Sequence, residues 1–193
     1  MTFAGAVLAG GESRRMGKDK AFVTVSGVAM VTSAVQALTT AGASAVIVVG
    51  GDAPRIAKLG LPQIVDEFPG EGPLGGIISA IAHFNSSDDD IDAVVILPCD
   101  LVSPSDAAVR SVTAALDDSG VDVVLPVVDD HAQWLHAAWR IRTLDSLSAD
   151  FAAGIRAPRR AVEKLTVRMI DGENSGWFRD ADRPEDLPRQ TGR

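Results

Sequence analysis

The stretch FAGAVLAGGESRRMGKDKA, residues 3–21, decides the fold of this chain. Its first seven residues are apolar on both alternating faces, as in a strand buried inside a parallel sheet. The residues that follow are rich in glycine and in basic side chains, which is typical of a loop. A buried strand that leads directly into such a loop indicates an α/β domain with a ligand site at the strand's carboxyl end.

Similar short runs of Val and Ile recur along the chain, and helical stretches separate them. The further strands are predicted at residues 44–50, 62–66, 92–98 and 122–128. The helices are predicted at about 28–41, 53–59, 74–85 and 104–118. This alternation predicts right-handed crossovers and a three-layer α/β sandwich around a mostly parallel, Rossmann-like sheet.

The start of the helix predicted at 104–118 can be assigned to individual residues. Ser103 is predicted as the N-cap, Pro104 as the first helical residue and Asp106 as the acid of a capping box, with Gly120 at the helix end. Beyond residue 129 the alternation of apolar runs and helical stretches is less regular. There we predict strands at 131–140, 166–171 and 177–180 and helices at 141–153 and 158–165.

Length and composition indicate one globular domain over residues 1–193. We divide it into a first part, about 1–128, and a second part, about 129–193. The single cysteine, Cys99, excludes an intramolecular disulfide and a Cys-based zinc site.

The N-terminus has no basic region of a secretory signal and no apolar run reaches the ~20 residues of a membrane span. We therefore expect a soluble, cytoplasmic protein, and a monomer because no apolar stripe indicates an interface.

The net charge of −8 is distributed unevenly. Residues 1–58 carry six basic and three acidic side chains, residues 59–139 one basic and fourteen acidic, and residues 140–193 eleven basic and nine acidic. This balance excludes a general nucleic-acid or anionic-membrane binder, which needs a basic field. It leaves room for a local anion site in the first segment.

The loop at residues 8–21 is that candidate anion site. Its glycines let backbone N–H groups approach a ligand, and its cations neutralise negative charge; they are Gly10, Gly11, Gly17, Arg14, Arg15, Lys18 and Lys20. The spacing differs from a Walker A loop, because Glu12 stands where a glycine is needed. A solvated surface turn is the alternative, but four cations within seven residues favour a polyphosphate.

Asp100 follows the buried run at 92–98, at a strand end where chemistry is expected. A Mg²⁺ ion takes carboxylate oxygens together with phosphates and waters, and often only one or two protein ligands. A turn acid before a helix is the structural alternative. Together with the cationic loop, metal binding is the better interpretation.

The segment LAGGESRRMGKDK resembles the signature LAGG-x-S-x-RMG-x-DK of nucleotidyltransferases similar to molybdenum cofactor guanylyltransferase. Further segments resemble other parts of that family in the same order: GPLGGI (72–77), PCD (98–100), HAAWR (136–140), AGIRAPRRAVEKL (153–165) and DADRPEDL (180–187). The resemblance implies a fold of the nucleotide-diphospho-sugar transferase type, with GTP and a molybdopterin-type acceptor as substrates and Mg²⁺ as cofactor. It also implies that the first part, about 1–128, is the nucleotide-binding part and that the second, about 129–193, is the acceptor-binding part. It also implies maturation proteins of molybdoenzymes as partners.

The resemblance assigns roles to individual residues. Nucleotide binding is implied for Leu8, Ala9, Gly10, Gly11, Lys20, Gly50, Asp66 and Asp100, and catalysis for Arg15, Lys20 and Asp100. Asp182 is implied as a second metal ligand beside Asp100, although the family usually has Asn there. Gly50 likewise stands where these enzymes commonly have an Asn that touches the nucleotide.

An acceptor site is implied for His136, Arg156, Arg159 and Arg160. A core-edge histidine and a solvated basic face are the structural alternatives. Cys99 is expected to be a buried, unreactive thiol.

The expected reaction is transfer of GMP from GTP to the terminal phosphate of molybdenum-bearing molybdopterin, with release of pyrophosphate. Two alternatives stay open from the sequence. One is a related nucleotidyltransferase that uses CTP or another small phosphate acceptor, and the other is a nucleotide-binding homologue without catalytic activity.

Overall fold

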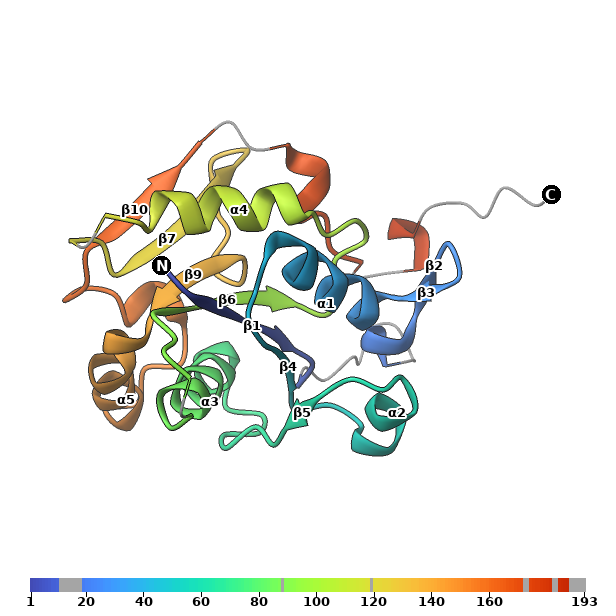
Figure 1. The fold of residues 1–193 in the computed structure, drawn as a ribbon, viewed down its shortest axis with the longest axis horizontal. Coiled ribbons are helices and arrows are strands. Elements are labelled where there is room, and N and C mark those ends of the chain that lie inside the picture. Colours follow the sequence, from blue (N-terminus) through green and yellow to red (C-terminus); the bar gives the residue numbers. More distant parts are fainter. Residues whose placement is uncertain (11–18, 88, 119, 172–173, 182–183, 188–193) are drawn as a thin grey trace.

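The structure is a computed structural model that describes residues 1–10, 19–87, 89–118, 120–171, 174–181 and 184–187. It is a central twisted sheet with helices on both faces (Figure 1). The three-layer α/β architecture predicted from the alternating pattern is thereby confirmed.

The strands are β1 (Phe3–Leu8), β2 (Thr24–Val25), β3 (Val28–Ala29), β4 (Val46–Val49), β5 (Gln63–Ile64), β6 (Ala93–Pro98), β7 (Val123–Val128), β8 (His131–Ala132), β9 (Ala137–Arg140) and β10 (Val167–Ile170). In the described residues the main sheet has the order β10-β7-β9-β6-β1-β4-β5, and β8 pairs with β7. Strand β9 is antiparallel to both β6 and β7, whereas β5, β4, β1 and β6 are mutually parallel. A separate hairpin is formed by β2 and β3.

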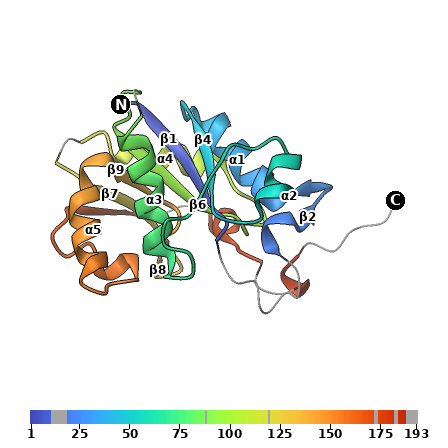
Figure 2. The ribbon, with the colours of Figure 1, turned by 90° about the horizontal axis from the view of Figure 1, so that it is seen from below.

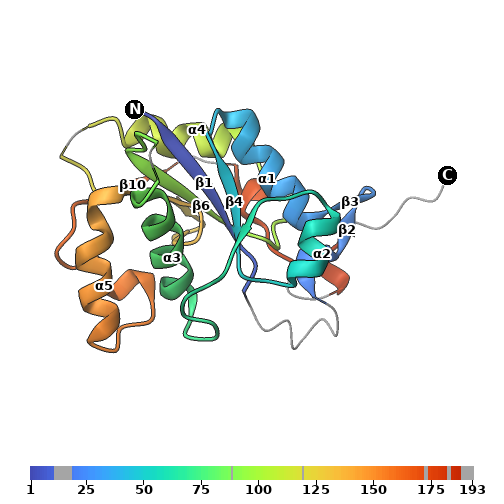
Figure 3. The same cartoon turned by 60° about the horizontal axis from the view of Figure 1, so that its bottom comes forward.

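The helices are α1 (Met30–Ala41), α2 (Ala53–Lys58), α3 (Pro73–Asn85), α4 (Asp106–Ala115) and α5 (Leu144–Ala152). Short 3-10 helices cover Lys20–Phe22, Ile141–Thr143, Pro158–Arg160, Ser175–Phe178 and Pro184–Asp186. One hydrophobic core joins α1 and α4 to the sheet, and the other joins α3 and α5 to its opposite face. Figures 2 and 3 show α3 and α5 side by side on their face.

Strand β1 occupies the middle of the sheet, between β4 and β6. Its last residue, Leu8, pairs with Val49 on one side and with Pro98 on the other. Because all three strands are parallel, their carboxyl ends lie at one edge. The loops that follow them, which hold Gly10, Gly50 and Asp100, are therefore brought together, as predicted for a ligand site.

The helix predicted at 104–118 is shorter than expected. It begins at Asp106, and its N-cap is Ser105, whose side chain accepts a hydrogen bond from the backbone N–H of Ala107 at 3.2 Å. The assignment of Ser103 as N-cap is wrong, because Ser105 has the extended backbone that a cap requires. The helix ends at Ala115, where Arg168 binds the last carbonyl.

Three predictions for the C-terminal third are corrected. The strand at 131–140 is two strands, β8 and β9, because the chain turns between them. Of the helix predicted at 158–165, only Pro158–Arg160 is helical. The next residue, Ala161, is fully buried in the core. The N–H of Thr166 donates a hydrogen bond to the carboxylate of Asp122, and β10 begins at the following residue. The first half of the strand at 177–180 belongs to the 3-10 helix Ser175–Phe178, which Asn174 caps, and Asp180 forms only an isolated β-bridge with Leu101.

The hairpin between β7 and β8 turns through Asp129 and Asp130, whose φ angles are 49° and 64°. Two successive positive φ angles are typical of a type I′ turn, in which glycine is preferred. We expect Asp130→Gly to raise the free energy of unfolding by about 0.5 kcal/mol, because glycine adopts this region without strain. A urea titration measures the shift. Asp130→Val, which is β-branched, should shift the midpoint the other way, and equal midpoints for both variants would contradict the turn assignment.

Candidate functional site

A cavity of about 590 Å³ opens at the carboxyl edge of the sheet, within the size range of small-molecule sites. Its described lining residues are Leu8, Ala9, Gly10, Asp19, Lys20, Val49, Asp66, Gly70, Gly72, Pro73, Gly76, Pro98, Cys99, Asp100 and Leu135. Six of the predicted nucleotide-site residues are among them: Leu8, Ala9, Gly10, Lys20, Asp66 and Asp100. The cavity therefore gathers predicted site residues that are up to 92 positions apart in the sequence, from Leu8 to Asp100.

Lys20 and Asp100 form an ion pair on the wall of this cavity. The Nζ of Lys20 lies 3.1 Å from Oδ2 of Asp100, and their side chains are only 14% and 20% exposed. Lys20 begins the first 3-10 helix, which Asp19 caps by accepting a hydrogen bond from the N–H of Ala21. The cap places the lysine against the end of β6, so that a cation and a carboxylate face the same space.

The turn that carries Asp100 is held by the C-terminal segment. The N–H of Ala181 donates to the carbonyl of Asp100 at 2.9 Å, and the N–H of Val102 donates to the carbonyl of Arg179 at 2.9 Å. Leu101 and Asp180 form the β-bridge between the two segments. The chain just before the predicted ligand Asp182 therefore lies beside Asp100. Asp182 itself is outside the described residues.

The donor set at this edge suits a magnesium ion. In the described ranges no three His, Cys, Asp or Glu side chains gather into a metal cluster. Mg²⁺ needs none, because it takes one or two carboxylates and completes its shell with phosphates and waters. Asp100, at the mouth of β6 in a cavity large enough for a nucleotide, meets that requirement.

Asp66 follows β5, which β1 and β4 separate in the sheet from β6, the strand that precedes Asp100. Its Oδ1 accepts hydrogen bonds from the N–H of Phe68 at 3.0 Å and from Oγ of Ser79 at 3.2 Å. The neighbouring backbone at Gly10 is so near that a Cβ built there would lie 3.3 Å from Oδ2 of Asp66. Glycine at this position therefore lets the first loop and Asp66 approach closely.

Gly50 lines a second, adjoining hollow of about 320 Å³, which shares Gly10 and Asp66 with the main cavity. Its φ is 69°, and a Cβ there would lie 3.3 Å from Cα of Gly10. The side-chain amide of Gln63 donates to the carbonyl of Gly50 at 2.7 Å. Glycine at position 50 thus allows close packing of the two loops, and Gln63 holds its turn.

Cys99 lines the cavity beside Asp100, but its thiol is protonated at neutral pH. Burial raises the pKa of this thiol to about 12, and the nearby carboxylates of Asp100 and Asp19 act in the same direction. Thiolate, not thiol, is the nucleophile. The geometry therefore agrees with the expected unreactive cysteine.

His136 is placed in the interior rather than on a surface that faces a ligand. It is 2% exposed, and its ring contacts the edge of Phe178 with 4.6 Å between centroids. Neither ring nitrogen has a hydrogen-bond partner among the described residues. Burial lowers the pKa of His136 from 6.5 to about 3, so the ring is neutral at physiological pH. Its neighbour Leu135, not His136, lines the cavity.

The three predicted acceptor arginines occupy different environments. Arg156 donates to Glu71 at 2.6 Å and to the carbonyl of Phe151 at 2.7 Å, and its guanidinium lies 3.9 Å from the centre of the Phe151 ring. It therefore ties the rim of the cavity at residue 71 to the end of α5. Arg159 and Arg160 are exposed on the 3-10 helix Pro158–Arg160.

Other predicted residues are outside the described ranges. They include Gly11 and Arg15 of the glycine-rich loop. The described ends of that loop, Gly10 and Asp19, both line the cavity.

Sequence reasoning did not assign Asp19, Gly72, Pro73, Gly76 and Leu135 to the site. The GPLGGI segment contains Gly76, and the structure shows why a glycine is needed there. A Cβ at Gly76 would lie 3.2 Å from Leu8, so glycine lets α3 approach the end of β1. No local signal marks Leu135, which reaches the cavity through the pairing of β9 with β6.

A mostly parallel sheet whose carboxyl edge gathers Gly10, Lys20 and Asp100 around one cavity is typical of nucleotide-binding α/β domains. The family model described as MobA-like NTP transferase domain matches residues 5–168, and the chain belongs to this family. The membership identifies it as a nucleotidyltransferase and confirms the resemblance seen in the sequence. Within the described ranges, none of the helices has the length and apolar character that a membrane crossing requires.

Among curated proteins, the chain is similar to a probable molybdenum cofactor guanylyltransferase of Bacillus anthracis. The two are 27% identical over 186 residues, which cover 91% of this chain and 89% of the relative. Among solved structures, it is similar to molybdopterin-guanine dinucleotide biosynthesis protein A from Archaeoglobus fulgidus, with a TM-score of 0.77, 22% identity and coverage of 95% and 94%.

The fold also matches 4-diphosphocytidyl-2C-methyl-D-erythritol synthase from Anaerococcus prevotii. The TM-score is 0.71, with 13% identity and coverage of 96% of this chain and 92% of that one. These likenesses confirm a fold of the nucleotide-diphospho-sugar transferase type. At identities of 22% and 13%, likeness to a solved structure indicates the fold but not which nucleotide is bound.

Because His136 is buried and neutral, we expect the free energy of unfolding to depend on pH in the acid range. Below pH 6.5 the unfolded chain binds a proton at this ring and the folded chain does not, so the free energy of unfolding falls as pH decreases. The loss approaches about 1.4 kcal/mol per pH unit for this one group. Urea titrations between pH 6.5 and 5 should show a flatter pH dependence for His136→Gln than for the wild type. His83→Gln, at an exposed histidine, is the control; identical slopes for all three proteins would contradict the prediction.

Proposed function

We propose that this chain transfers GMP from GTP to the terminal phosphate of a molybdopterin-type acceptor and releases pyrophosphate. The observation that carries the proposal is the cavity at the carboxyl edge of the sheet, in which Lys20 and Asp100 face each other and which Gly10 also lines. Family membership and the guanylyltransferase name of full-length relatives support the choice of reaction.

The reaction needs positioning and charge neutralisation more than a strong base. An oxygen of the acceptor phosphate, already anionic at neutral pH, attacks the α-phosphorus of GTP. The bond from that phosphorus to the bridging oxygen breaks, and pyrophosphate leaves with the electron pair. Lys20 binds the phosphate oxygens, and the backbone N–H groups that follow β1 supply further donors. Arg15 is proposed to share the phosphate charge.

Asp100 is proposed to hold Mg²⁺, with Asp182 as a second ligand. When bound, the ion supplies charge neutralisation at the phosphate oxygens. Asp100 supplies the ligand oxygen, and its turn is fixed from behind by the bonds to Arg179 and Ala181. Leu8, Ala9, Gly10, Gly11, Gly50 and Asp66 are proposed to bind the nucleoside part.

The acceptor side is proposed to use the exposed Arg159 and Arg160, whose charges suit a phosphate. Arg156 contributes differently from the sequence-based expectation. Its pairing with Glu71 holds the rim at Gly70–Pro73 in place. His136 packs on Phe178, which precedes the segment that holds the turn of Asp100.

Removal of the Lys20 ammonium tests the phosphate-binding role. We expect Lys20→Ala to lower the rate of GMP transfer about 100-fold or more, in the range of lost transition-state donors. Pyrophosphate release from GTP in the presence of molybdopterin, followed with time, measures the rate. Lys58→Ala, at an exposed lysine of α2, is the matched control. A wild-type rate for Lys20→Ala with an unchanged melting temperature would rule out this role.

A comparison of the four nucleoside triphosphates tests the base. GTP should give acceptor-dependent pyrophosphate release at low micromolar enzyme, and CTP, ATP and UTP should give much less. Release with CTP in preference to GTP would overturn the guanine assignment. Binding of GTP without any release in the presence of acceptor would instead identify a homologue without catalytic activity.

A further inference from the structure

We propose that Ser79 on α3 is a positioning residue for Asp66, and that through Asp66 it sets the affinity of the site for GTP. The inference rests on the proposed function, since it assumes that Asp66 contacts the nucleotide. Ser79 does not line the cavity and was not a candidate site residue. Its role comes from three hydrogen bonds and from the packing of one loop on one helix.

Ser79 is a polar side chain in a helix that is otherwise packed into the core. It is 2% exposed, and its helical neighbours from Leu74 to Ile81 are buried as well. A buried hydroxyl needs hydrogen-bond partners. The usual partner of a helical serine is the carbonyl four residues earlier, and the Oγ of Ser79 lies 3.0 Å from the carbonyl of Gly75.

Two further contacts go beyond that helical bond. The N–H of Glu67 donates to the Oγ of Ser79 at 3.0 Å, and this Oγ lies 3.2 Å from Oδ1 of Asp66. The backbone contact fixes where the oxygen of Ser79 lies. The hydroxyl proton is then directed either to the helix carbonyl or to the Asp66 carboxylate, and the charged oxygen is the stronger acceptor.

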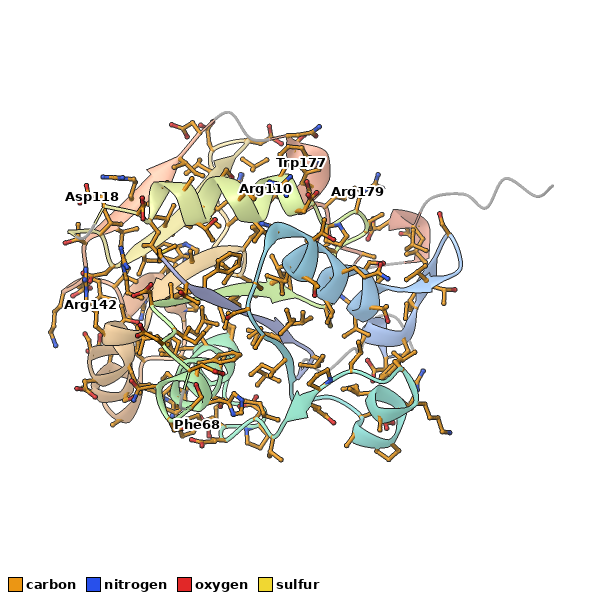
Figure 4. All side chains as sticks on the ribbon, in the orientation of Figure 1. Phe68, Arg110, Asp118, Arg142, Trp177 and Arg179 are labelled. Carbon is orange, nitrogen blue, oxygen red and sulfur yellow. The ribbon has the colours of Figure 1, made fainter. Side chains whose placement is uncertain are left out.

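The loop at residues 66–68 is pressed onto the first turns of α3. A Cβ at Gly75 would lie 2.7 Å from Cβ of Phe68, so only a glycine permits this approach. The Phe68 ring packs on Phe151 of α5 with centroids 4.5 Å apart, and Figure 4 shows Phe68 beside α3 at the edge of that helical layer. One helical turn beyond Gly75, Ser79 meets the carboxylate at the start of the loop.

The result is an Asp66 side chain with two unequal oxygens. Oδ1 accepts from the N–H of Phe68 and from Ser79, whereas Oδ2 accepts no hydrogen bond from the described residues. Oδ2 lies toward Gly10, and both Asp66 and Gly10 line the cavity. Ser79 thus helps to hold one carboxylate oxygen as a fixed acceptor for an N–H or O–H donor of the nucleoside.

The test is a double-mutant cycle on GTP binding, with Ser79→Ala, Asp66→Ala and the double variant. Equilibrium titration with GTP and Mg²⁺ measures each dissociation constant. We expect Ser79→Ala to weaken binding about tenfold, the effect of losing a hydrogen bond to a charged group. In the Asp66→Ala background the same change should have no further effect, because Ser79 acts through that carboxylate.

In steady state, Ser79→Ala should raise KM for GTP and leave kcat within about twofold, because uniform binding is lost. Thr113→Val is the matched control, since it removes a buried hydroxyl that bonds only helix carbonyls of α4. It should change neither constant. If Ser79→Ala does not fold, Ser79→Cys, which is slightly larger and keeps only a weak donor, takes its place in the cycle.

The outcomes separate this inference from the proposed function. Wild-type affinity in Ser79→Ala, additive effects in the cycle, or wild-type affinity in Asp66→Ala would each overturn the positioning role. A wild-type protein that binds GTP and transfers no GMP would overturn the proposed reaction alone. In that case the cycle on binding still decides the role of Ser79.

Discussion

The central constraint of this structure is that β1 is buried between two parallel neighbours. Its backbone bonds β4 on one side and β6 on the other, so its ends cannot move independently of theirs. Parallel pairing brings three carboxyl ends to one edge, and the loops after them supply Gly10, Gly50 and Asp100. The helices on both faces bury the strands and leave this edge open. A ligand site at any other place would lack these converging loops.

The electrostatics of the site follow from that convergence. A chain of net charge −8 appears unsuited to an anionic ligand, but the charge is distributed by segment. The fold places Lys20 from the basic first segment against Asp100 from the acidic middle one, where both are largely buried. Each charge makes the burial of the other less unfavourable. The site can therefore present a cation to phosphate and a carboxylate to a metal ion within one cavity.

The sequence predicted the strands well and the irregular parts poorly. The five apolar runs all contain strands, because buried parallel strands have a simple apolar pattern. The start of α4 was misplaced from Ser105 to Ser103, since two serines flank a proline and only the backbone conformation selects the cap. The residues beyond 129 were harder, because β9 is antiparallel to β6 and β7. The pattern of apolar residues along the chain does not indicate the order of the strands in the sheet.

Some site residues could likewise be predicted from the local sequence, whereas others could not. The amino-acid sequence alone indicates the kind of chemistry, because a glycine-rich loop with cations after a buried strand, and an acid after another, are local patterns with a direct physical meaning. The roles of the other residues depend on the tertiary structure. It buries His136 against Phe178 and pairs Arg156 with Glu71, and it brings Ser79 of α3, which no sequence pattern singled out, to Asp66. Those outcomes depend on contacts between segments far apart in the chain, and such contacts follow from packing rather than from local sequence.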